Sequence, residues 1–82
     1  MRGQIEVGDL VTIAGTFPAR YVDPMTGYFH EGHASFRDDV ALEVVRVRYP
    51  YCTVAPSARG YKGVKYLIDL RETEPEPYPP DR

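Results

Sequence analysis

The feature that most limits the fold of this chain is the absence of a convincing helical period, because the few apolar residues spaced three or four apart lie among β-branched residues. Instead, several segments alternate apolar and polar residues, as strands do when one face is buried. The clearest alternating segments are residues 41–49, 51–55 and 64–70, and a shorter one covers residues 10–14. The sequence therefore predicts an all-β protein with short strands.

One irregularity in segment 41–49 has a structural consequence. Val44 and Val45 are adjacent apolar residues, so strict alternation fails between them. A β-bulge at this point would return the later apolar side chains to the core and turn Arg46 and Arg48 toward solvent. The alternative is a strand that is buried on both faces at this point.

Residues 16–39 show no period of either kind, and glycines, prolines and scattered aromatic residues interrupt them. A structureless segment of this length is uncommon in a compact domain. We therefore expect one long decorated loop that folds back and packs, as an irregular hairpin around residues 23–27. That segment, DPMTG, has turn chemistry because proline fixes φ and Gly27 can adopt a positive φ.

The length of 82 residues allows one domain, which we assign to residues 1–71. The remaining segment, residues 72–82, reads ETEPEPYPPDR. Prolines lack an amide donor and restrict the residue before them. The composition therefore predicts an extended, disordered, Pro-rich tail outside the fold.

Short strands without helices predict a small antiparallel barrel or a strongly bent sheet, because closing a sheet on itself removes its edges. Residues 8–15, GDLVTIAG, resemble the turn and first strand of SH3-like and KOW-type barrels. Residues 64–70, VKYLIDL, are similar to the closing strand of those barrels. The resemblance implies an SH3-like fold, with nucleic-acid binding as the function that KOW-type modules imply. The chain departs from the KOW pattern after Gly15, where TFPARY replaces a second glycine.

Cationic and tyrosine side chains concentrate between residues 46 and 65, although the whole chain has a net charge of −2. Guanidinium groups bind carboxylate or phosphate, and tyrosine rings provide contact area and stacking surfaces. Arg46 and Arg48 would share one face of an extended strand, since side chains two residues apart lie on the same side. The candidate binding residues are Arg46, Arg48, Tyr49, Tyr51, Arg59, Tyr61, Lys62 and Lys65.

This surface predicts a non-enzymatic binding protein whose partner is another protein. The chain resembles, in style, the small accessory proteins of bacteria and phages that bind a host target. Nucleic acid is the alternative partner, although overall acidity argues against strong nonspecific binding. A second copy of the chain is a further candidate, because an unclosed sheet edge can pair with its copy. The same charges also fit a solvated face that pairs with Glu43, Asp69 or Glu72.

A minor alternative is a metal- or thiol-dependent enzyme. His30 and His33 lie three residues apart, and Cys52 could add a ligand or act as a nucleophile. The alternation around Cys52 instead predicts a buried thiol, and two solvated histidines fit a polar loop. We therefore expect no catalytic residues, no metal and no cofactor.

The single cysteine cannot form an internal disulfide. No apolar run approaches the roughly 20 residues that cross a bilayer, and the N-terminal segment lacks the apolar core of a signal peptide. These features predict a cytoplasmic protein with no membrane partner.

Overall fold

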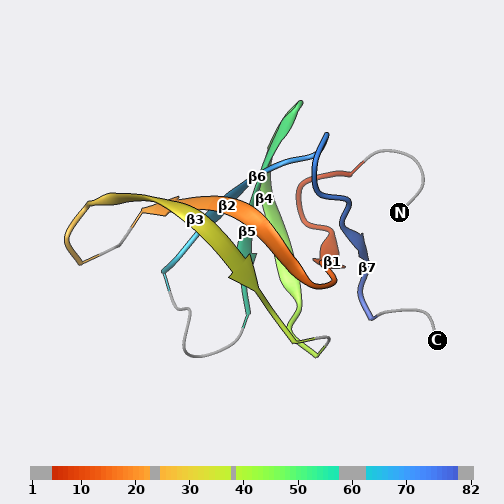
Figure 1. Cartoon of the computed structure of the whole chain (residues 1–82). Helices are drawn as coiled ribbons and strands as arrows, with labels where there is room; N and C mark the ends of the chain where they lie inside the picture. Colours follow the sequence, from red (N-terminus) through yellow and green to blue (C-terminus); the bar gives the residue numbers. More distant parts are fainter. Residues whose placement is uncertain (1–4, 23–24, 38, 58–62, 80–82) are drawn as a thin grey trace.

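A computed structural model describes residues 5–22, 25–37, 39–57 and 63–79. The described residues form seven antiparallel strands in one sheet and contain no helix (Figure 1). The strands are β1 (Leu10–Thr12), β2 (Thr16–Val22), β3 (Phe29–Ser35), β4 (Leu42–Arg48), β5 (Tyr51–Pro56), β6 (Tyr66–Asp69) and β7 (Glu76–Pro77). Their order across the sheet is β3-β2-β6-β5-β4-β1-β7. The all-β antiparallel prediction is therefore confirmed.

The core lies on one face of this sheet, which curves so that β2 and β3 run across the direction of β4 and β5 (Figure 1). The register places Val44 beside Val54 and Val54 beside Tyr66, so apolar side chains of neighbouring strands stand together. The largest fully buried side chains are those of Leu42, Ile68, Val11, Val44, Val54 and Cys52. Burial of each aliphatic side chain stabilises the fold by about 1.5–3 kcal/mol.

Strand β4 contains the predicted bulge. Two consecutive residues of β5 pair with Val44 and Arg46, so Val45 is the extra residue between them. Val44 is fully buried, whereas Arg46 and Arg48 are exposed. Both the position of the bulge and the outward direction of the two arginines are confirmed.

The prediction that the region between β1 and β4 folds back as a hairpin is confirmed, but the hairpin is regular, so the prediction of a long irregular loop is wrong. Strands β2 and β3 pair continuously over seven residues each. Gly27 has a φ of 76° in the connection, as the turn chemistry predicted, while residues 23 and 24 lie outside the described residues. Aromatic rings hold the hairpin on the core: the ring centroids of Phe36 lie 5.9 Å from Phe17 and 5.4 Å from Tyr66.

Part of the C-terminal segment belongs to the sheet, because the two residues of β7 pair with β1. The backbone N–H of Tyr78 donates to the carbonyl oxygen of Leu10 at 3.1 Å. The hydroxyl of Tyr78 donates to the carbonyl oxygen of Asp39 at 3.3 Å. The prediction of a disordered tail is therefore wrong for residues 73–79, of which Glu76, Pro77 and Tyr78 bind an edge of β1 that would otherwise be open. Residues 80–82 lie outside the described residues.

Candidate binding face

The outer face of the sheet carries the side chains that alternate with the core residues. Across its middle, the register aligns one residue from each of five neighbouring strands. This central row runs through Arg46, Thr53, Leu67, Arg20 and Glu31. Because neighbouring strands lie about 4.8 Å apart, the central row is a continuous strip of surface.

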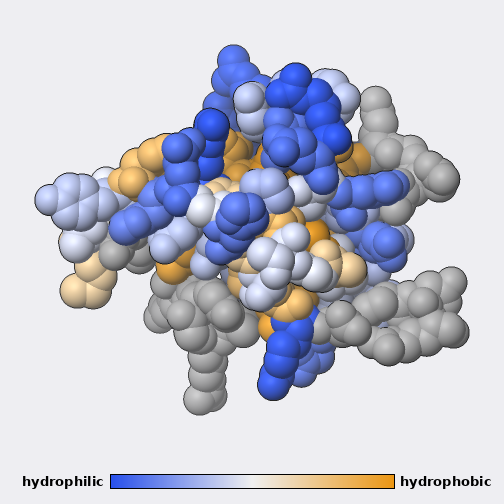
Figure 2. Space-filling view, in the orientation of Figure 1, coloured by the Kyte–Doolittle hydropathy of each residue, from blue (hydrophilic) through white to orange (hydrophobic). Residues whose placement is uncertain are grey.

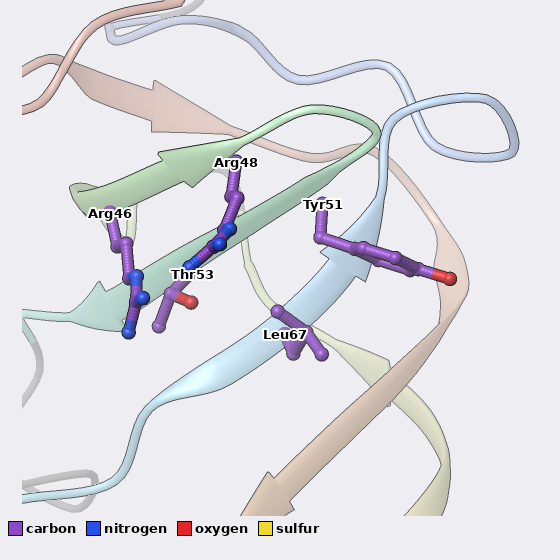
Figure 3. A pocket seen from close by; sticks show the side chains of 5 residues that line it. All are labelled: Arg46, Arg48, Tyr51, Thr53 and Leu67. Atoms are coloured by element: carbon purple, nitrogen blue, oxygen red, sulfur yellow. The ribbon is translucent and has the colours of Figure 1, made fainter.

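A hollow of about 180 Å³ lies on this face over β4, β5 and β6. Its lining consists of Arg46, Arg48, Tyr51, Thr53 and Leu67, and we call it the arginine hollow. Figure 3 shows the guanidinium ends of Arg46 and Arg48 on the same side of the sheet, with Thr53 next to them. The hollow is smaller than the roughly 300–1,000 Å³ of small-molecule pockets, so it fits one side chain or one charged group.

The two arginines of the hollow have no ion pair with any carboxylate in the described part of the chain. Other arginines are paired: Arg20 Nε lies 2.8 Å from a carboxylate oxygen of Glu31, and Arg37 pairs with Asp39 at 3.0 Å. Two unneutralised guanidinium groups on one face attract an anionic group, and salt screens that attraction.

An acidic residue at the border of the hollow has its own cation. Asp69 lies opposite Tyr51 in the register, and Arg71 Nη2 lies 2.8 Å from its carboxylate. The side-chain and backbone hydrogen bonds from Arg71 hold the pKa of Asp69 below its usual value. The same contact raises the pKa of Arg71. Asp69 is therefore paired with Arg71 and not with an arginine of the hollow.

The structure describes five of the predicted binding residues. Arg46, Arg48 and Tyr51 line the arginine hollow. Tyr49 is 74% exposed in the turn after β4, and Lys65 is exposed before β6, but neither belongs to the lining. The predicted residues that lie outside the described part of the chain are Arg59, Tyr61 and Lys62.

Two lining residues were not among the predicted binding residues. The side chains of Thr53 and Leu67 point to the outer face of the sheet. Thr53 is in register with Arg46, and Leu67 is in register with Thr53. Their alternation with the core residues is a signal that the sequence contains. Arg20 joins the same row only because β2 is a strand, which the sequence analysis did not recognise.

The residues of the enzymatic alternative do not come together. The ring of His30 stacks on Tyr21 at 4.9 Å. His33 lies an odd number of residues further along β3, so it points to the opposite face. Cys52 is buried in the core, and burial raises the pKa of its thiol. Within the described ranges, no three His, Cys, Asp or Glu side chains are placed to hold a metal ion.

None of the described elements is a helix with the length and apolar character needed to span a membrane. Comparison of the chain with protein-family models, curated proteins and solved structures found no match. Inference about function therefore rests on the outer face of the sheet.

Proposed function

We propose that this protein is a non-enzymatic binding module that recognises a protein partner through the outer face of β4, β5 and β6. In this proposal the arginine hollow takes an acidic side chain of the partner. The proposal is supported above all by two arginines that have no ion pair within the described residues and that line the hollow together with Leu67 and Tyr51. Arginine and tyrosine are enriched among the residues that dominate the energy of protein interfaces.

The shape of the hollow favours an acidic side chain over a larger ligand. Arg46 and Arg48 lie two residues apart, so their Cα atoms are about 7 Å apart along β4. A carboxylate between them can accept hydrogen bonds from both guanidinium groups, or from one in a bidentate pair. Leu67 then contacts the aliphatic part of the same side chain.

The proposal includes an SH3-like arrangement of the sheet and the role of a bacterial or phage accessory protein. The turn at Gly8, with a φ of 97°, and the short strand that follows support the SH3-like part. The exposed arginine hollow on the outer face supports the accessory role.

Single-stranded nucleic acid is the second candidate partner. One observation favours it: the partly exposed ring of Tyr51 lines the hollow together with two arginines, and bases stack on such rings. Carboxylates on the same face oppose a polyanion, since Glu31 belongs to the central row and Glu72 lines an adjoining hollow beside Asp69. The protein partner is therefore favoured.

Charge reversal tests the proposal. Arg46→Glu is compared with Arg37→Glu, which changes the net charge equally at an exposed arginine outside the hollow. A partner captured from the native host by the wild-type protein is purified and titrated with both variants. We expect binding to weaken at least about tenfold for Arg46→Glu, as for loss of a charged hydrogen-bonded contact, and to be unchanged for Arg37→Glu.

A second titration separates the two kinds of partner. Labelled polyglutamate and labelled oligothymidine are each followed by fluorescence anisotropy as salt is added. If Arg46→Glu and Arg37→Glu bind the captured partner with equal affinity, the arginine hollow is not part of the binding site. Steeply salt-dependent binding of oligothymidine that is lost in Arg46→Glu would instead favour the nucleic-acid candidate.

A further inference from the structure

The two end strands of the sheet differ in how well they are protected. Strand β7 has two residues and contains Pro77, with Pro75 and Pro79 two residues to either side. Strand β3 has seven residues, without proline or lysine, and its register with β2 has no bulge. No strand among the described residues pairs with the other side of β3. Exposed edges normally carry proline, lysine or a bulge that prevents pairing, so β3 is open to another strand.

We propose that two copies of this chain pair through β3, antiparallel, about a two-fold axis at Gly32. This arrangement places Gly32 opposite the partner's Gly32. It also places Glu31 opposite the partner's His33, and His33 opposite the partner's Glu31. Every contact occurs twice, as an isologous interface requires.

Charge selects this register over its symmetric neighbours. Glu31 and His33 are both exposed, and the carboxylate of Glu31 has a second oxygen beside the one that lies 2.8 Å from Arg20 Nε. An imidazole N–H donates to a carboxylate whether the ring is neutral or charged. A two-fold axis at Glu31 would place two carboxylates against each other, and an axis at His33 would place two imidazoles together. The axis at Gly32 therefore pairs an acid with a base on both sides.

The pairing also covers apolar surface at the free end of the hairpin. Tyr28 is 71% exposed and Phe29 is 59% exposed, and both lie at the start of β3. Figure 2 shows pale orange, apolar atoms at the surface on the left, where Figure 1 draws the free end of the β2–β3 hairpin. In the proposed register Phe29 lies opposite the partner's Ser35. Because the other end strand is short and proline-rich, pairing stops at two copies and does not continue into a fibre.

The molecular mass of the protein in solution reports whether two copies pair. Light scattering or sedimentation equilibrium should show the mass rising with concentration from 9.3 kDa toward twice that value. Glu31→Lys should weaken the dimer about tenfold, because two symmetry-related pairs lose the carboxylate that accepts the imidazole N–H. Glu76→Lys makes the same charge change on β7 and should leave dimerisation unchanged. The exchange Glu31→His/His33→Glu restores an acid opposite a base and should restore the dimer.

A disulfide tests the position of the axis. Across the two-fold axis the Cα atoms of Gly32 would lie about 4.5–5.5 Å apart, within reach of a disulfide. A Cβ added at Gly32 meets nothing within 4 Å, so Gly32→Cys fits the fold. In the control Ser35→Cys the two Cα atoms would lie roughly 20 Å apart. Native Cys52 is buried in both variants.

We expect rapid covalent dimer formation under mild oxidation for Gly32→Cys and not for Ser35→Cys. A wild-type mass that stays at the monomer value at all concentrations would overturn the proposal. So would equal cross-linking of the two cysteine variants, or a dimer insensitive to Glu31→Lys. The proposal is independent of the arginine hollow, so Arg46→Glu should leave the mass unchanged.

Discussion

Deletion of Val45 is expected to leave the protein folded, although β4 lies inside the sheet. Val45 is the extra residue of the bulge. Without it, Val44 and Arg46 become consecutive, and their partners Val54 and Thr53 are already consecutive in β5. The inward and outward directions along β4 are therefore kept, and the ladder becomes regular.

The expected change in stability is small. The deletion removes one half-buried valine, which costs about 1 kcal/mol, and the regular ladder can add a hydrogen bond that contributes about 0.5–1.5 kcal/mol. The net change in the free energy of unfolding is then about 1 kcal/mol or less. A domain of 82 residues is expected to have a total of about 4–12 kcal/mol, so the variant stays folded.

Deletion of Val47 is the matched control, since it removes the same residue type from the same strand. After this deletion, either Arg46 or Arg48 must take the place of Val47 opposite Cys52. That position faces the core, since Cys52 is 1% exposed. Loss of the valine contacts and desolvation of a guanidinium group together cost about 3 kcal/mol or more. We therefore expect a strongly destabilised or unfolded protein.

Urea unfolding measures the free energy of unfolding of both deletion variants. The chain contains seven tyrosines and no tryptophan, so tyrosine fluorescence and far-ultraviolet circular dichroism follow the transition. If deletion of Val45 lowers the free energy of unfolding as much as deletion of Val47, the assignment of Val45 as the extra residue is refuted.

Three further predictions concern single side chains. The Arg71 hydrogen bonds lower the pKa of Asp69 from 3.8, so their stabilising contribution is present above that pH and is lost as pH falls through the lower folded value. The loss of stability between about pH 5 and about pH 2 should therefore be smaller in Asp69→Asn than in wild type, as measured by urea midpoints. Burial and the raised pKa of the Cys52 thiol predict no reaction with Ellman's reagent in the native protein and full reaction in urea; rapid native labelling would contradict this. The buried hydroxyl of Thr73 has no hydrogen-bond partner within the described residues, so Thr73→Val should raise the free energy of unfolding by about 1 kcal/mol, and a fall would show that the hydroxyl is satisfied.

The parity of residues made the central strands predictable. Apolar residues alternate along β4 except at the adjacent Val44 and Val45. That single exception was sufficient to predict the bulge and the outward direction of Arg46 and Arg48. The hollow between them could not be predicted as a unit, because it depends on which strand lies next to β5. That neighbour is β6, and its Leu67 completes the lining.

The two regular strands of the β2–β3 hairpin were not recognised because proline, histidine and glycine interrupt the alternation of apolar residues in them. Proline at position 18 argues against a strand, yet β2 pairs with β6 only at Arg20 and Tyr21, so Pro18 needs no amide hydrogen on that side. On β3 the inward positions include His30 and Gly32 rather than large aliphatic residues, and alternation is not visible there. Stability comes instead from aromatic contacts that no local pattern reports.

The C-terminal segment was mispredicted for a related reason. Composition describes the preference of an isolated segment, and a segment rich in proline and glutamate prefers an extended, solvated chain. An edge strand is hydrogen-bonded on one side only, so a residue without an amide hydrogen is tolerated there. Pro77 is therefore compatible with pairing to β1. The buried Pro75 and the hydrogen bonds of Tyr78 then fix that segment in place.

The position of β1 between β4 and β7 also affects how the chain reaches its native state. Both neighbours of β1 are distant in sequence, and β7 comes from the opposite end of the chain. Closing such long loops costs conformational entropy before the contacts between the strands can form. Hairpins β2–β3 and β4–β5 can form within microseconds, but the complete sheet is expected to assemble over milliseconds to seconds, with docking of β7 among its last steps.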